Sequence, residues 1–167
     1  KEQQNYIYDL NPAVLNFRLS ASSLIQKKTG GIDALLQDFK DCMTSCSLAE
    51  NLFDRGIIYK FLLNSVIMLT IRRPDIDFTP LIQNMLFYAK PKFYPGQKAY
   101  LYYLESYINK NEEKEYLLKA LSFIKTSGSL YFSALLYIKL GLYYLKDGSV
   151  NFAIVNFLEA KKFVMDR

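Results

Sequence analysis

Hydrophobic residues recur with helical spacing along the whole chain, and prolines, glycines and capping residues divide this pattern into segments of ordinary helix length. The segments cover about residues 12–28, 32–46, 47–73, 79–90, 97–109, 112–125, 130–146 and 149–167. No segment shows the sustained alternation expected of a β-strand. The pattern therefore predicts an all-α protein of about eight helices, whose short connections favour antiparallel hairpins.

Residues that begin or end helices support these limits. Pro12 stands where the first helix begins. Ser47 and Glu50 have the spacing of a capping box, and Asp147-Gly148 is expected to turn the chain before the last helix. A loop rich in proline and aromatic residues at 91–96 separates residues 1–94 from residues 95–167. We expect the two parts to pack as one continuous domain.

Residues 134–167 carry aromatic and small residues at characteristic positions. In order, these are Tyr137, Leu140, Gly141, Tyr144, Ala153, Phe157 and Ala160. Gly141 and Ala153 lack bulky side chains, so two antiparallel helices can approach closely there. The set resembles the tetratricopeptide repeat (TPR) family at seven of eight signature positions, with Met165 in place of the closing proline.

A weaker copy of this pattern lies 37 residues earlier, where Tyr107 corresponds to Tyr144. The remaining positions of the copy depart from the family pattern and carry Leu104, Tyr116, Ala120 and Phe123. The resemblance implies a TPR-like α-solenoid in which residues 95–167 form two TPR-like repeats. Residues 1–94 share the helix-hairpin character and are expected to be divergent helical hairpins or an N-terminal helical cap.

In TPR proteins the first helix of each repeat lines a groove that holds a peptide or a segment of another protein. The resemblance implies the partner-binding residues Leu101, Tyr102, Glu105, Leu135, Ile138, Lys139, Leu142 and Lys146. The implied groove is largely apolar, which favours a helical or hydrophobic segment as its ligand. Tyr102 is singled out because it lies off the face shared by the neighbouring tyrosines, which are expected to fill the core.

The segment 130–146 is apolar on nearly all sides, and segment 149–167 also has little polar surface. Such helices should be covered, whereas the last repeat of a solenoid normally has a polar outer face. Four kinds of cover are open: a further C-terminal helix, the N-terminal half, a second copy of the chain, or a different protein.

Composition excludes several kinds of chemistry. The chain has no histidine and two cysteines, which rules out the common zinc sites and Ser-His-Asp or Cys-His catalysis. Cys42 and Cys46 lie on an apolar helix face and are expected to be small buried hydrophobic residues. The nearest groups of carboxylates, Glu112, Glu113 and Glu115 and the pair Asp75 and Asp77, are typical of a helix start and a loop and converge with no second motif. No phosphate-binding loop or nucleophile elbow occurs, so we expect no catalytic residue, cofactor or metal and no enzymatic activity.

The net charge of +5 comes from basic residues scattered in doublets near helix ends. This pattern does not favour nucleic-acid binding, which needs a basic stripe. The apolar stretch 130–145 is short for a bilayer and contains Lys139, so no transmembrane segment is expected. The compartment stays open between the cytoplasm and, if an upstream signal or anchor was removed, the periplasmic side of an envelope.

The sequence therefore favours a non-enzymatic scaffold or adaptor that binds another protein or peptide, and a homo-oligomer is also open. The alternative is a peptide-sensing TPR-like domain of a bacterial regulator whose DNA-binding part is absent.

Overall fold

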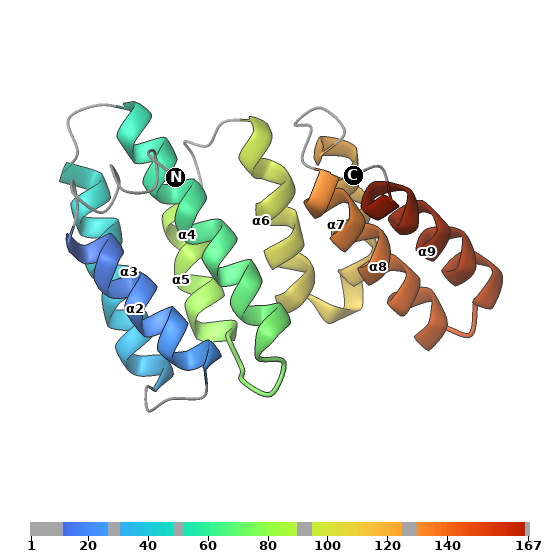
Figure 1. Cartoon of the computed structure of the whole chain (residues 1–167), viewed down its shortest axis with the longest axis horizontal. Helices are drawn as coiled ribbons and strands as arrows, with labels where there is room; N and C mark the ends of the chain where they lie inside the picture. The colour runs from blue at the N-terminus through green and yellow to red at the C-terminus, as the bar shows by residue number, and fades with distance from the viewer. Residues whose placement is uncertain (1–11, 27–30, 49–51, 90–94, 125–129, 166–167) are drawn as a thin grey trace. The chain divides into compact units, whose positions relative to one another are not determined.

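A computed structural model describes residues 12–26, 31–48, 52–89, 95–124 and 130–165. Within these ranges all regular structure is helical, which confirms the all-α prediction. The chain divides into two compact units, residues 1–93 and 94–167, and successive helices run antiparallel within each unit (Figure 1). The division falls beside the expected boundary at residue 94, while packing as one continuous domain stays a prediction.

The first unit is held together by aromatic and aliphatic side chains. It contains α2 (Pro12–Ile25), α3 (Ile32–Leu48), α4 (Leu52–Arg72) and α5 (Thr79–Ala89). Phe17 of α2 and Phe39 of α3 are fully buried, and their rings meet edge to face with centroids 6.3 Å apart. The Tyr59 hydroxyl of α4 donates to the Met85 carbonyl of α5 over 3.2 Å. Apolar packing and this buried hydrogen bond therefore link the helices of the unit.

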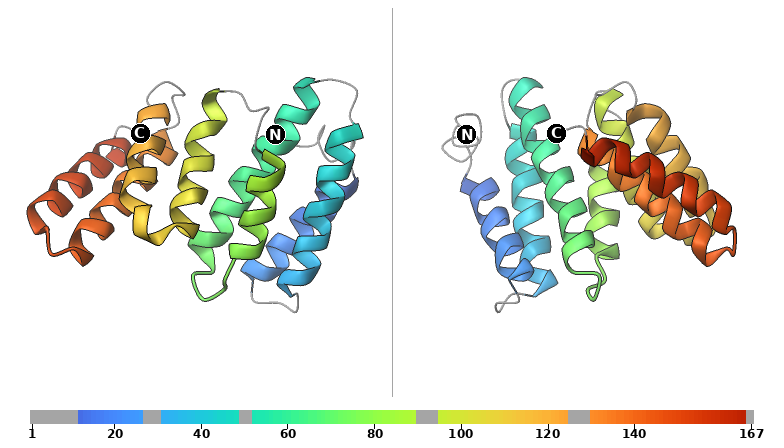
Figure 2. Two further views of the ribbon diagram at one scale, coloured as in Figure 1. Left: turned by 180° about the vertical axis from the view of Figure 1, so that it is seen from behind. Right: turned by 45° about the vertical axis from the view of Figure 1, so that its right-hand side comes forward.

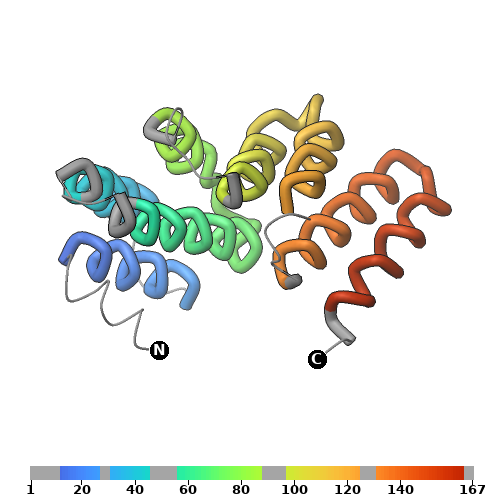
Figure 3. The backbone as a smooth tube through the Cα atoms, turned by 90° about the horizontal axis from the view of Figure 1, so that it is seen from above, coloured from blue at the N-terminus to red at the C-terminus, as the bar shows by residue number. Residues whose placement is uncertain are grey.

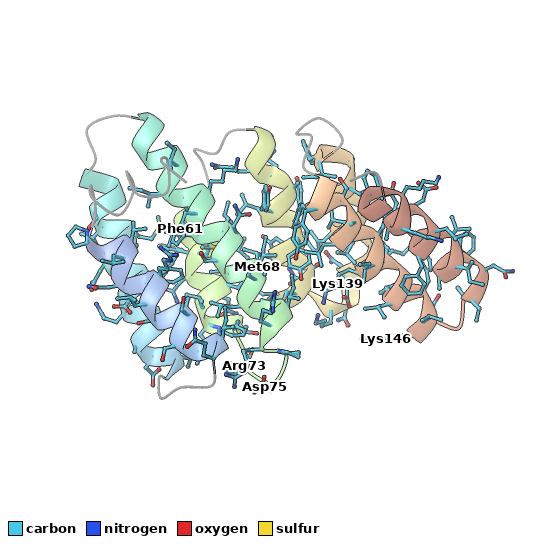
Figure 4. All side chains as sticks on the ribbon, viewed as in Figure 1. Phe61, Met68, Arg73, Asp75, Lys139 and Lys146 are labelled. Atoms are coloured by element: carbon cyan, nitrogen blue, oxygen red, sulfur yellow. The ribbon has the colours of Figure 1, made fainter. Side chains whose placement is uncertain are left out.

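Arg73 connects the end of α4 to the end of α2. Its guanidinium donates to the Leu24 carbonyl in the last turn of α2, and to both carboxylate oxygens of Asp75 over 2.8 and 2.7 Å. Figure 4 shows Arg73 and Asp75 beside each other in the connection before α5. A cation at a helix C-terminus is favourable because the last carbonyl groups lack partners within the helix.

The second unit contains α6 (Pro95–Ile108), the short 3₁₀ helix η1 (Lys110–Glu112), α7 (Glu113–Ile124), α8 (Leu130–Lys146) and α9 (Val150–Met165). Phe132 of α8 lies against two tyrosines of α6, with ring centroids 4.3 Å from Tyr100 and 5.7 Å from Tyr103. All three side chains are buried, which confirms that Tyr100 and Tyr103 fill the core, whereas Tyr107, for which the same was expected, is half-buried. The contact joins α6 to α8, the next helix but one.

α8 and α9 lie side by side as an antiparallel hairpin in the views of Figure 2 and Figure 3. Gly148 ends α8 with φ of 75°, and its N–H bonds to the Leu145 carbonyl while the Ser149 N–H bonds to the Tyr144 carbonyl. This pair of bonds is the Schellman motif, which glycine tolerates best. The predicted turn at Asp147-Gly148 is therefore confirmed.

The two helices approach closely at Gly141. A Cβ atom placed there would meet three ring atoms of Phe157 at 2.5 to 2.8 Å. Ala153, which was expected to face Gly141, is fully buried, but the nearest atoms to Gly141 belong to Phe157. The expected close crossing is present, and an aromatic ring fills the space that glycine leaves.

Two predicted helix ends were wrong. α3 continues to Leu48, so Ser47 lies within α3 and does not begin a capping box, and α4 begins at Leu52. α6 begins at Pro95, inside the predicted loop, because proline suits the first turn of a helix. The expected stop near residue 28, Glu50 of the box, residues 91–94 of the loop and the break at 127–129 lie outside the described residues. Cys42 is buried as predicted, and the side chain of Cys46 lies outside the description.

Replacing Arg73 should loosen the first unit. Arg73→Met leaves the Leu24 carbonyl without its donor, which should lower the free energy of unfolding. Amide hydrogen exchange in α2 should become faster, and urea denaturation should give the loss of stability. Arg72→Met is the matched control because Arg72 is exposed one residue earlier. Equal effects of the two substitutions would contradict the assigned role of Arg73.

Gly141→Ala tests the close approach of α8 and α9. Overpacking costs about 1–3 kcal/mol and outweighs the gain in helix propensity of about 1 kcal/mol, so the variant should be destabilised. In a Phe157→Leu background the same alanine should be neutral or stabilising, because the ring that it meets is gone. Thermal unfolding of the four proteins in this double-mutant cycle measures the coupling. No coupling would mean that Phe157 does not set the separation of the helices.

Candidate functional site

One stripe of α8 exposes aliphatic side chains. Ile138, Leu142 and Leu145 recur at intervals of four and three residues, so they lie along one line of the helix. A second stripe runs along α9, where Val150, Ile154 and Leu158 recur every four residues. The six side chains are between 40% and 55% exposed. Soluble helices usually place such residues inward, so the two stripes are candidates for a binding surface.

The contact between Gly141 and Phe157 shows how the two stripes are oriented. Ile138 and Leu142 stand three residues before and one after Gly141, and Ile154 and Leu158 stand likewise around Phe157. Successive residues of a helix point in directions that differ by about 100° about the helix axis. Residues at these offsets therefore point away from the line of contact between α8 and α9 by a similar angle in both helices. In antiparallel helices equal rotations of this kind lead to the same side of the pair. The six residues therefore form one surface, here called the aliphatic face.

The opposite side of the hairpin is aromatic. Tyr137 stacks on Phe163 with centroids 5.8 Å apart, and Tyr144 stacks on Phe152 at 5.3 Å. The ammonium of Lys114, from α7, lies 5.2 Å from the centre of the Tyr144 ring. Tyr144 therefore has contacts on this side with both α7 and α9, while Phe152 is largely exposed there.

Lysines border the aliphatic face. Lys139 and Lys146 each follow a residue of the α8 stripe, and the rotation of the helix places them on the edge remote from α9 (Figure 4). Lys161 stands three residues after Leu158 and continues the α9 stripe. Lys146 and Lys161 are exposed, whereas Lys139 is half-buried. The aliphatic face therefore has a positive border.

Burial is the main cause of a lowered pKa at Lys139. Repulsion from Lys110 and Lys146 lowers the pKa further, while the carboxylate of Glu113 raises it. Glu113 is itself 3.9 Å from the ammonium of Lys110, so its charge is shared between two cations. The charged form of Lys139 is thus less stable in the folded chain than in water.

The predicted partner-binding residues divide into two groups. Ile138, Leu142, Lys139 and Lys146 lie on or beside the aliphatic face, and Leu135 is buried in α8. The three residues from α6 are half-buried, and Glu105 accepts a hydrogen bond of 2.9 Å from the Asn109 side chain. These three residues are Leu101, Tyr102 and Glu105. Whether any of the eight binds a partner stays a prediction.

Tyr102 packs inside its own hairpin. Its ring centroid lies 5.5 Å from that of Phe123 and 6.3 Å from that of Tyr116, both in α7. In the shifted repeat Tyr102 corresponds to Lys139, which does not face α9. The two hairpins therefore use different faces of their first helices, and the 37-residue shift does not pair structurally equivalent positions. Tyr102 does lie off the face of the buried tyrosines, but that side of α6 meets the aromatic rings of α7.

The α9 half of the aliphatic face is not among the partner-binding residues predicted from the sequence. Val150, Ile154 and Leu158 belong to the apolar segment 149–167, and Lys161 belongs to one of the basic doublets. Their regular spacing was visible in the sequence. What the sequence did not give was the rotation of α9 about its axis, which the Phe157 ring fixes.

The described residues contain no group of three or more Cys, Asp or Glu side chains that could hold a metal ion. None of the described helices combines the length and the apolar character needed to cross a bilayer. Comparison of the chain with protein-family models, curated proteins and solved structures gave no match. The likeness to TPR proteins therefore rests on the residues of the chain itself.

Replacing Lys139 should stabilise the protein near neutral pH. Lys139→Met removes a charge that the fold disfavours, with an expected gain of less than about 1 kcal/mol because solvent still screens the half-buried group. The pKa of Lys139 is lowered in the fold, so the unfolded chain binds this proton more tightly. Wild-type stability should consequently rise as the pH increases from that lowered pKa toward the ordinary value of 10.5.

The measurement is the difference in unfolding free energy between Lys139→Met and the wild type at pH 7 and at high pH. Subtraction removes the titration of the tyrosines, which both proteins share. The advantage of the variant should shrink at high pH, and an advantage that does not change with pH would contradict the electrostatic cause.

Proposed function

We propose that the protein is a non-enzymatic interaction module that binds a helical or hydrophobic segment of another protein through the aliphatic face. The observation that carries this proposal is the exposure of six aliphatic side chains on one side of α8 and α9. Two adjacent apolar stripes offer an apolar surface that suits the apolar side of a helix. The proposal treats the protein as a scaffold or adaptor.

Features of the second unit that are typical of helical repeats support the same proposal. The α8–α9 hairpin carries the family's small residue at Gly141 and a glycine-containing turn before its second helix. Buried aromatic side chains also join α6 to α8, so hairpins contact one another through their first helices as they do in a helical repeat. We therefore propose a TPR-like solenoid in which α8–α9 is the most regular repeat and α6–α7 is a divergent one.

The size of the face limits the affinity that it can give. Burying a fully exposed leucine, isoleucine or valine side chain contributes about 1.5–3 kcal/mol. Six side chains that are about half exposed should then contribute about 5–8 kcal/mol before the cost of ordering both partners. Apolar contact alone thus corresponds to a dissociation constant of about 1 µM or weaker. Tighter binding needs further contacts at the border of the face.

A pull-down with quantitative mass spectrometry tests this function. Leu142→Glu places a charge in the middle of the face, and proteins that bind there should be depleted at least about tenfold relative to the wild type. Leu118→Glu in α7 is the matched control, because Leu118 is 45% exposed and Leu142 is 44% exposed. Circular dichroism should show that both variants keep their helix content.

Partners that the wild type and Leu118→Glu retain but Leu142→Glu loses support the proposal. If the folded Leu142→Glu variant keeps every partner, the aliphatic face is not the binding surface.

A further inference from the structure

The charges around the aliphatic face are one-sided. α8 contains Lys139 and Lys146 and no acidic residue. In α9 the carboxylate of Glu159 pairs with Lys162, which leaves Lys161 as the charged residue on the line of the stripe. A ligand on this face therefore meets aliphatic side chains in the middle and ammonium groups at the border. Opposite charge on the ligand would be favoured there.

The two α8 lysines also define a spacing. Lys139 and Lys146 are seven residues apart, which is about 10.5 Å along a helix. Each lysine directly follows an aliphatic residue of the α8 stripe, Ile138 or Leu145. The spacing of the charges along the edge of the face is therefore the same as the spacing of these two aliphatic residues. A partner helix lying along α8 would match them with carboxylates that are also seven residues apart. Those carboxylates would stand beside the apolar stripe of the partner helix.

Lys139 should gain more than Lys146 from an opposite charge on the ligand. It is half-buried, and the charged groups around it are Lys110, Lys146 and the single carboxylate of Glu113. A second carboxylate beside Lys139 would favour its charged form, and a lysine half-withdrawn from water gains more from an ion pair than a fully exposed one does.

We propose that the aliphatic face binds an amphipathic helix of a partner protein whose apolar stripe is bordered by carboxylates seven residues apart, which pair with Lys139 and Lys146. This inference rests on the proposed function and adds to it the charge and the spacing of the ligand.

Two other occupants fit the observations less well. A second copy of the chain joined through the same face would bring the lysine borders of both copies together, and like charges oppose that contact. A bilayer surface favours aromatic side chains at its interface, but in this hairpin the stacked aromatic pairs lie on the opposite side. On the α8 stripe, Tyr131 near the start of the helix is the exposed aromatic residue.

The test uses three synthetic helical peptides with the same leucine stripe and with Glu, Gln or Lys at the two border positions. Titration calorimetry with the whole chain should show that the Glu peptide binds about tenfold more tightly than the Gln peptide, and that the Lys peptide binds more weakly than both. High salt should reduce the advantage of the Glu peptide.

Variants then locate the effect. Lys139→Gln combined with Lys146→Gln should abolish the difference between the Glu and Gln peptides while the Gln peptide still binds. Lys40→Gln combined with Lys60→Gln is the matched control, since it removes the same charge from exposed positions in α3 and α4. This control should keep the tenfold difference.

The outcomes separate the two proposals. Equal binding of the Glu and Gln peptides, both lost in Leu142→Glu, overturns the acidic border and leaves the proposed function standing. If no peptide binds, or if Leu142→Glu binds as the wild type does, the proposed function fails as well. Binding to phosphatidylserine vesicles that needs both lysines, without preference for the Glu peptide, would assign the face to a membrane. A dimer that Leu142→Glu dissociates in sedimentation would assign it to a second copy, and either result overturns the inference.

Discussion

The close contact between Gly141 and the Phe157 ring determines how α8 packs against α9. Glycine leaves room for the ring, and the ring then fixes how far apart α8 and α9 lie and how each is rotated about its axis. Because Ile138 and Leu142 stand at the same offsets from Gly141 as Ile154 and Leu158 do from Phe157, this rotation directs both stripes to one side. The packing that forms the hairpin thus also assembles the exposed face.

α4 and α8 show why composition alone does not reveal a binding surface. Both helices are rich in aliphatic residues, yet α4 buries Leu62, Leu63 and Val66 completely, whereas α8 exposes Leu142 and Leu145. The difference lies in the helices that surround each of them and not in their own residues. Exposed aliphatic side chains and a half-buried lysine contribute little to folding, which is why we propose that they serve binding.

Local signals allowed most helix limits to be predicted. Pro12 and Gly148 act through their own backbone preferences, which are the same in any fold. The prediction that a helix begins at Ser47 was wrong because the Ser-x-x-Glu spacing of a capping box also occurs inside helices. Packing decides whether a helix begins at such a serine. Tyr102 packs against α7 although it lies off the face of the core tyrosines. Helical spacing shows which residues share a face of a helix, but it does not show which neighbouring helix that face contacts. The spacing of the α9 stripe could be predicted from the sequence. The side of the hairpin on which the stripe lies could not.

The two sides of the α8–α9 hairpin carry different kinds of side chain. Stacked rings have preferred geometries, so Tyr137 with Phe163 and Tyr144 with Phe152 resist sliding of one helix along the other. Branched aliphatic side chains have no such directional preference and accept many apolar partners. For the ligand that we propose, specificity would come from the charged border of the face, because a lysine discriminates between a carboxylate and an ammonium group far better than leucine discriminates between two apolar surfaces.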